Sequence, residues 1–221
     1  MKKIVTFVLL CEGSSDQPLV EHLQVLLVSR GADEANGYAD WQKGSVSAKL
    51  AKLRDEGAPV DVAFVHRDAD SPDAGRRIRE IEKGVGEAGF TDPCLPVVPV
   101  QETEAWLLID EAAIRSAVGN PNGTVPLGLP SPEQVEHVAR PKEALAEALA
   151  SASGKSGRRL AQEKKRFSER RRTLLQRLDP EGIVRRVPSW QRLERAIDEL
   201  VESQGWATEY RAGSSGPASW V

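Results

Sequence analysis

The sequence predicts an α/β protein whose mostly parallel sheet is flanked by helices and followed by a C-terminal helical extension. Two apolar runs, 4–10 and 60–65, are continuous and rich in β-branched residues, which is typical of strands that helices cover on both faces. Segments with helical periodicity alternate with these runs. This alternation favours parallel strands joined by right-handed crossovers.

The α/β part can be followed element by element. Asp16 and Pro18 mark the start of a helix whose leucines form an apolar face until Gly31. The polar segment 32–44 is expected to be irregular, with a short strand at 38–41 as an open alternative. Apolar runs and helical spacing predict the other elements: strands at 4–10, 60–65 and 95–100, and helices at 47–56 and 73–89.

The composition changes after Asp110. The segment 119–132 is rich in Gly, Asn and Pro and is expected to be a loop that can lie across an active site. Later segments are expected to be helical, at 132–139, 141–150, 157–178 and 189–202. We therefore expect an α/β catalytic domain at 1–118, a helical extension at 119–204 and a disordered tail at 205–221.

Length and composition agree with a compact enzyme. A chain of 221 residues with 40% apolar content can bury one sizeable core. No run approaches the roughly 18 apolar residues of a membrane span, and no signal-peptide cleavage site follows the N-terminus. Cys11 and Cys94 lack metal-ligand spacing, which argues against zinc and for small core residues in a reducing compartment. A cytoplasmic protein with no membrane partner is expected.

Four carboxylates follow the two strongest strands. Glu12 and Asp16 come just after the run 4–10, and Asp68 and Asp70 come just after the run 60–65. The carboxyl ends of neighbouring parallel strands are where α/β proteins bind ligands. Oxygen ligands at such a place suit Mg²⁺ or Mn²⁺, and two such ions are the usual apparatus for cutting phosphodiesters.

The spacing suggests a role for each acid. Asp68 and Asp70 are two residues apart, so an extended backbone would turn both side chains to one side as a metal clamp. Glu12 would complete the first ion's ligands or act as general base, which makes Glu12, Asp68 and Asp70 the catalytic candidates. Asp16 could hold a second ion. The metal-ligand candidates, including a second pair of acids after the run 95–100, are Glu12, Asp16, Asp68, Asp70, Glu102 and Glu104.

These elements resemble the TOPRIM domain, the metal-dependent catalytic module of topoisomerases, primases and the overcoming-lysogenization-defect nucleases. In that family a Glu follows the first strand and an Asp-x-Asp follows a later one, which correspond here to Glu12 and to Asp68 with Asp70. The nuclease branch adds an acid four positions after the Glu, and Asp16 occupies that place. The resemblance implies a TOPRIM-like fold and a divalent-metal-dependent nuclease.

A second block narrows the resemblance. The segments 99–110, 140–142 and 179–180 look like those of small standalone TOPRIM-like proteins that are largely uncharacterised. This similarity extends to about Leu200. It hints that Lys142 neutralises a scissile phosphate, although Lys142 could also be an ordinary exposed lysine.

Simpler structural interpretations exist for the other candidates. Asp16 could be no more than the N-cap of a helix. Asp70 could likewise be the N-cap of the helix that comes after it in the chain. Glu102 and Glu104 could be solvated first-turn acids favoured by the helix dipole. His66 is a catalytic candidate or a strand-end surface residue.

A basic run lies between Lys155 and Arg177, in a chain whose net charge is −3. It contains ten Lys or Arg against two Glu, which is typical of a surface that binds a polyanion, or of a solvated helix with a buried apolar stripe. No motif for reading base sequence is present. The nucleic-acid-binding candidates are Lys142, Arg166, Arg170, Arg171 and Arg172.

The function expected from these features is a Mg²⁺- or Mn²⁺-dependent phosphodiesterase that cuts DNA or RNA. The resemblance implies anti-phage or anti-plasmid defence beside an ATPase, which would be a separate protein because 154–156 lacks the rest of a Walker phosphate loop. A non-catalytic subunit that binds a partner protein or a nucleotide is the alternative. A complete topoisomerase or primase would need further domains.

Overall fold

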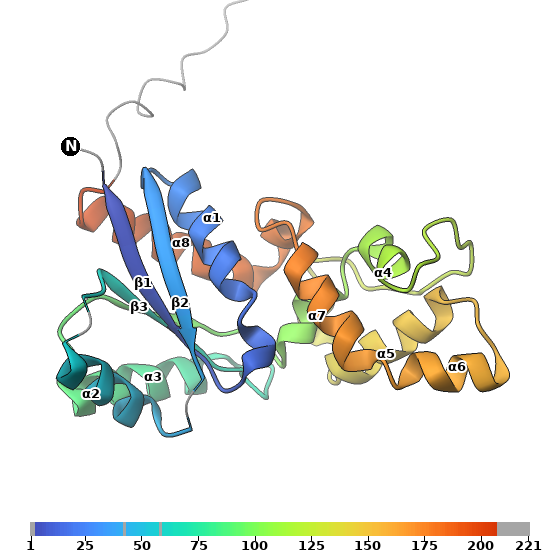
Figure 1. Ribbon diagram of the computed structural model, residues 1–221, viewed down its shortest axis with the longest axis horizontal. Coiled ribbons are helices and arrows are strands. Elements are labelled where there is room, and N and C mark those ends of the chain that lie inside the picture. The colour runs from blue at the N-terminus through green and yellow to red at the C-terminus, as the bar shows by residue number, and fades with distance from the viewer. Residues whose placement is uncertain (1–2, 42, 58, 207–221) are drawn as a thin grey trace, which may run out of the picture.

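The computed structural model describes residues 3–41, 43–57 and 59–206 and contains one sheet of four parallel strands. The strands stand in the order β2-β1-β3-β4 (Figure 1). Their bounds are β1 (Ile4–Leu10), β2 (Glu34–Asp40), β3 (Val62–His66) and β4 (Cys94–Val97). The expected α/β class and parallel sheet are confirmed, and the arrangement is consistent with a TOPRIM-like fold.

Helices cover both faces of the sheet. One face packs against α1 (Leu19–Ser29) and α8 (Pro188–Ser203), and the other against α2 (Val46–Glu56) and α3 (Gly75–Ala88) (Figure 1). Alternate residues of β3 serve the two cores: Phe64 packs with the first and Val65 with the second. This two-sided burial explains why the central strands are continuously apolar.

The remaining helices form a lobe beside the carboxyl ends of the strands (Figure 1). They are α4 (Glu111–Ala117), α5 (Pro141–Ala152), α6 (Gly157–Lys164) and α7 (Phe167–Arg177). Four 3-10 turns complete the description: η1 (Ser14–Asp16), η2 (Thr103–Leu107), η3 (Val135–His137) and η4 (Ile183–Arg186). The expected C-terminal helical extension is confirmed, and its last helix returns to the sheet, where Arg192 donates to the carbonyl of Val98.

The largest correction concerns β2, which was expected to be irregular or a short strand at 38–41. It is a full edge strand paired with β1 along its whole length. Its sequence is polar because much of it is exposed, and its central Gly37 is required by packing. A Cβ at Gly37 would lie 2.1 Å from the ring of Phe7, its partner on β1.

Two predicted helices and one predicted strand were also wrong in detail, and one helix was missed. The expected helix 157–178 is two helices, α6 and α7, separated at Lys165 and Arg166. The expected helix 132–139 is only the turn η3, and α4 was not predicted. The strand expected at 95–100 ends at Val97.

Two expectations concern the chain as a whole. The predicted tail falls almost entirely outside the described residues, so the structure does not test its disorder. Among the helices in the described ranges, none has the length and apolar character needed to cross a membrane. The division at residue 118 stays a prediction.

Candidate active site

The acids lie at the switch point of the sheet. From β1 the chain moves to β2 on one side, whereas from β3 it moves to β4 on the other. The loops that leave β1 and β3 therefore diverge and open a crevice at their carboxyl ends, which is the usual ligand site of open α/β sheets. Glu12 and Asp16 lie in the segment that follows β1, and Asp68 lies in the segment that follows β3.

A cleft of about 570 Å³ opens at this place, between the sheet and the helical lobe. Five of the six predicted metal ligands line it: Glu12, Asp16, Asp68, Glu102 and Glu104. Three predicted phosphate-binding cations, Lys142, Arg171 and Arg172, line it too. We call this the acidic cleft. The sequence thus predicted most of the residues that meet in it.

Asp16 is held by a cation and caps no helix. It ends the turn η1 and is 7% exposed, while α1 begins at Leu19 without a side-chain cap. Its Oδ1 accepts a 2.9 Å hydrogen bond from Nη2 of Arg171 on α7. The helix-cap interpretation of Asp16 is therefore wrong.

Glu104 is bound to the same guanidinium. It is 5% exposed, and its Oε1 accepts a 3.0 Å hydrogen bond from Nε of Arg171. Nη1 of Arg171 donates to the carbonyl of Ser15 at 2.9 Å. Burial opposes the positive charge, yet Glu104 and Asp16 raise the pKa of Arg171 above its ordinary value. Glu104 is thus no solvated acid, and Arg171 is an internal cation.

Asp68 carries negative charge that few donors offset. Its Oδ1 accepts hydrogen bonds of 2.9 Å from both the backbone N–H and the hydroxyl of Thr103. Burial raises the pKa of Asp68, and the nearby charges of Glu104 and Asp16 raise it further, although His66 and Thr103 act in the opposite direction. A cation placed here would relieve this accumulation of charge.

His66 stands between the two acids at the end of β3. Its Nδ1 lies 3.8 Å from Oδ2 of Asp16, and its Nε2 lies 3.8 Å from Oδ1 of Asp68. Nε2 is hydrogen-bonded to the Thr103 hydroxyl at 3.0 Å, whereas the buried Nδ1 has no hydrogen-bond partner among the described residues. At 2% exposure, His66 is not the surface residue that one interpretation of the sequence suggested.

Glu12 lies at the outer edge of the acidic cleft and is paired with a basic residue that the sequence analysis overlooked. Its Oε1 is 2.6 Å from Nε of Arg67, which also approaches Glu80 at 3.3 Å. The Glu12 side chain is 56% exposed, so this pair is weak and can exchange partners.

Asp70 does not join Asp68 in a clamp. Its φ is +50°, in the left-handed region, so the backbone is not extended there and the expected common direction is lost. Its Oδ2 is 2.7 Å from Nη2 of Arg77. Asp70 lines a neighbouring hollow of about 270 Å³ that shares Glu102 and Lys142 with the acidic cleft.

Glu102 supports the start of α5. Its Oε2 accepts a 3.1 Å hydrogen bond from the backbone N–H of Lys142, which is an otherwise unpaired donor of the first helical turn. Glu102 is partly exposed, so the solvated-acid interpretation agrees better with it than with Glu104. The exposed Lys142 side chain lines both hollows.

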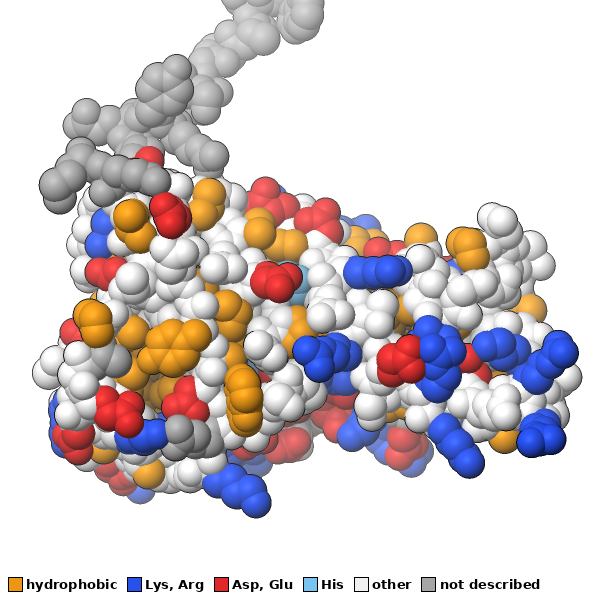
Figure 2. Space-filling view, in the orientation of Figure 1, with side chains coloured by type: hydrophobic (Ala, Val, Ile, Leu, Met, Phe, Trp, Pro, Cys, Tyr) orange, Lys and Arg blue, Asp and Glu red, His pale blue; other side chains and the backbone are white. Residues whose placement is uncertain are grey.

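The predicted basic surface is divided between paired and exposed cations. Arg166 pairs with Glu169, and Arg170 pairs with the buried Glu163. Arg172 is exposed beside the acidic cleft. Figure 2 shows Lys and Arg side chains gathered over the part of the surface that α6 and α7 form.

The chain matches the family model described as Domain of unknown function (DUF4276) over residues 11–202. It belongs to this family. Neither a curated protein nor a solved structure matches the chain. The DUF4276 region includes the loops after β1 and β3 together with the helical lobe, so both walls of the acidic cleft lie within it.

The side chains of the acidic cleft fit a divalent ion in kind, although they form no ready-made site. Within the described ranges no three His, Cys, Asp or Glu side chains already form a metal-binding group. The donors nevertheless fit Mg²⁺ or Mn²⁺ in kind, because carboxylate oxygens are the ligands these ions prefer. Asp68 and Asp16 would hold the ion, because both carboxylates line the acidic cleft on either side of His66, and the exposed Glu12 could join them.

The sequence analysis missed the partners of the predicted residues. Arg67 binds Glu12, Arg77 binds Asp70, and Thr103 binds Asp68. Arg67 lies between His66 and Asp68, so its position beside the predicted acids was a usable signal. Nothing local marks Thr103, because its role depends on how η2 approaches the end of β3.

Proposed function

We propose that this protein is a Mg²⁺- or Mn²⁺-dependent phosphodiesterase that cuts nucleic acid in the acidic cleft. The observation that carries the proposal is the meeting of Glu12, Asp16, Asp68 and Glu104 in one cleft at the switch point of the sheet, where burial and the charges of Glu104 and Asp16 also raise the pKa of Asp68. A buried carboxylate with a perturbed pKa in a cleft is typical of a functional site, and a bound divalent ion would account for this one.

The cations around the acidic cleft suit a phosphodiester. Lys142 and Arg172 are exposed, line the cleft and make no ion pair with the described residues. Either could bind the phosphate on one side of the bond to be cut. Arg171 is buried and fixed by three hydrogen bonds, so its role is to position Asp16 and Glu104 and not to follow a moving substrate.

A bound divalent ion would supply the attacking group, because it lowers the pKa of its water and stabilises charge on the phosphate oxygens. Residues of the chain would do the rest. Asp68 is oriented by Thr103, whose hydroxyl is also hydrogen-bonded to His66. Arg171 already neutralises two of the acids, which favours one ion and a fixed cation over two ions.

Purified protein incubated with plasmid DNA and with structured and unstructured RNA, with Mn²⁺ or with EDTA, tests this function. Cleavage that needs the metal and disappears in Asp68→Asn is expected. Arg76→Gln, an exposed substitution on α3, is a matched control that should cut normally. If the protein binds the metal and cleaves none of these substrates, the proposed nuclease activity is rejected.

A second candidate is a non-catalytic subunit that binds a partner protein or a nucleotide. One observation favours it: Glu12, Asp16, Asp70 and Glu104 each already pair with an arginine of the chain. In this case Mn²⁺ would not bind measurably. Isothermal titration with Mn²⁺ separates the two candidates before any substrate is chosen.

The setting of this activity is also a proposal. Cys11 and Cys94 are free, which suits a reducing cytoplasm. Work with a separate ATPase in anti-phage or anti-plasmid defence is supported by the resemblance to the overcoming-lysogenization-defect nucleases. Co-purification from cells that carry the native gene neighbourhood would test the partnership.

A further inference from the structure

The helical lobe contains a further hollow, of about 720 Å³, between α5, α6 and the start of α7. This volume lies within the roughly 300–1,000 Å³ typical of ligand sites. Its walls include Leu149 and Ala150 of α5, Leu160 of α6 and Phe167 of α7. We call it the lobe hollow. None of the acids predicted to bind metal lines it.

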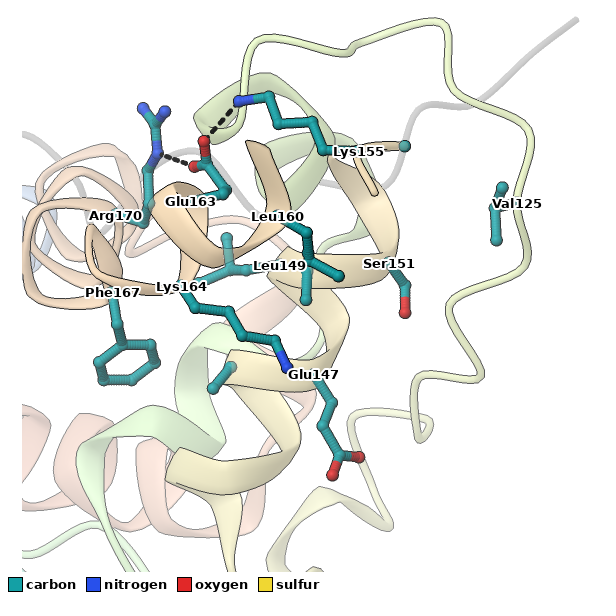
Figure 3. A pocket seen from close by; sticks show the side chains of 13 residues that line it. Val125, Glu147, Leu149, Ser151, Lys155, Leu160, Glu163, Lys164, Phe167 and Arg170 are labelled. Carbon is teal, nitrogen blue, oxygen red and sulfur yellow. Dashed lines mark hydrogen bonds and ion pairs between the residues drawn. The ribbon is translucent and has the colours of Figure 1, made fainter. Parts of the chain in front are cut away.

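The lobe hollow combines an apolar wall with a basic edge. Figure 3 shows Leu160, Lys164 and Phe167 pointing in the same direction, away from the ion-paired group at the other side. That group is Glu163 with Lys155 and Arg170. With Lys164 and Glu147, the lining holds three basic and two acidic side chains. Lys164 is exposed and makes no ion pair with a described residue. A ligand with a flat apolar part and an anionic part matches this lining.

Phe167 connects the lobe hollow with the acidic cleft, because its side chain lines both. A chain molecule that crosses Phe167 would therefore have one unit in each cavity. Exposed cations on α6 and at the residue after it add to the positive charge of the lobe: Arg158, Arg159 and Lys165. This continuity, with the charge, indicates a polyanion whose units carry apolar faces.

We propose that the lobe hollow binds the base of a nucleotide beside the one whose phosphate enters the acidic cleft, so that the substrate is single-stranded DNA or RNA. This deepens the proposed function and rests on it for the role of the cleft. In a duplex the bases are stacked and their faces are hidden, whereas an unpaired base can enter an apolar hollow and stack on an aromatic ring such as Phe167. Lys164 then meets the adjoining phosphate.

Fluorescence anisotropy in EDTA measures this binding without cleavage. The probes are oligothymidine, oligouridine, an abasic strand of the same length and a duplex of the same length. Oligothymidine should bind at least about fivefold more tightly than the abasic strand, which is the lower end of what one stacked base contributes. It should also bind more tightly than the duplex. Equal affinity for the abasic strand, or tighter binding of the duplex, would overturn the proposal.

Substitutions that fill the lobe hollow test whether the base binds there. Ala150→Trp and Ser151→Trp each place a large ring in the lobe hollow and should remove the preference for oligothymidine over the abasic strand. Ala161→Trp is the matched control, because Ala161 is exposed on α6 and does not line the hollow. Retention of the preference in both filled variants, with normal folding, would place the base elsewhere.

The two proposals fail separately. A single-strand preference that Ala150→Trp removes, in a protein that never cuts, would reject the nuclease and keep the lobe hollow. Metal-dependent cutting by a protein that binds abasic and thymidine strands equally would keep the nuclease and reject base binding in the lobe hollow.

Discussion

Arg171 of α7 donates a 2.9 Å hydrogen bond to Asp16, which lies 155 positions earlier in the chain, and both residues are buried. The same guanidinium holds Glu104. This contact joins the helical lobe to the carboxyl end of the sheet, so the acidic cleft has a wall from each. The negative charge of the acidic cleft is therefore balanced only when the helical lobe packs against the sheet.

Removing this cation should destabilise the protein strongly. Arg171→Leu would leave Asp16 and Glu104 buried without their partner, and breaking a buried pair in this way costs about 3–5 kcal/mol. Urea unfolding at pH 7 measures the loss. Arg172→Leu, at the exposed neighbouring position, should change stability by less than about 0.5 kcal/mol. Equal effects of the two substitutions would show that the buried contact does not form.

Asp68 and Asp70 should differ in metal binding, although they share one motif. Asp68 lines the acidic cleft, whereas Asp70 has left-handed backbone and pairs with Arg77 outside it. We expect Asp68→Asn to weaken Mn²⁺ binding at least about tenfold, the loss seen even for groups that only support a ligand. Asp70→Asn, which tolerates a positive φ, should have a much smaller effect. Isothermal titration decides, and the opposite ranking would move the ion to the hollow beside Asp70.

Asp68→Asn should not reduce stability at pH 7. Burial, Glu104 and Asp16 raise the pKa of Asp68, so the folded state binds its proton more tightly than the unfolded state does. Above the ordinary pKa of an aspartate, ionisation of Asp68 is therefore costlier in the folded state, and an amide removes that cost while it can still accept from Thr103. Urea unfolding checks this. A large loss of stability would mean that the carboxylate is satisfied without a metal.

Glu163 should make stability depend on acid pH. Hydrogen bonds from Arg170 and then Lys155 lower the pKa of Glu163 from 4.5 to about 2. Because the folded pKa is depressed, its contribution is fully present above about pH 4.5 and is lost as the pH falls through about 2. Wild type should therefore lose its advantage over Glu163→Gln across this range in urea unfolding at several pH values. Parallel profiles would contradict the ion-paired group at the lobe hollow.

Salt dependence should identify the cations that meet phosphate. Arg170 and Arg171 are ion-paired, so the exposed set Lys164, Lys165 and Arg172 is the one to reverse to Glu. Each cation that neutralises a phosphate of a single strand contributes about 0.7 to the log-log salt slope. The triple variant should bind more weakly with a flatter slope. The charge-matched control reverses Arg76, Arg79 and Lys83 on α3 and should retain the wild-type slope.

Much of the fold follows from local patterns. The buried strands β1 and β3 are apolar on both faces, so their sequence alone marks them, and the acids that follow them must lie at one edge of the sheet. The strand β2 is different because it lies at the edge. Its polar residues match an irregular segment as well as a strand, and only the ring of Phe7 explains Gly37.

The acidic cleft was predictable in its acids and not in its cations. Arg171 belongs to a run in which every basic residue looks solvated, and nothing local separates it from Arg172. Its burial depends on a helix that starts at Phe167 and meets residues far away in sequence. The bend at Asp70 was hidden for a similar reason, since its backbone N–H pairs with Gln101, which is distant along the chain.

Anomalous diffraction from crystals grown with Mn²⁺ tests the central claim most directly, because it locates the ion itself. The account predicts one manganese peak in the acidic cleft, within coordination distance of Asp68 and Asp16, and no peak there in Asp68→Asn. Absence of manganese from the acidic cleft in the wild type, at saturating Mn²⁺, would contradict it.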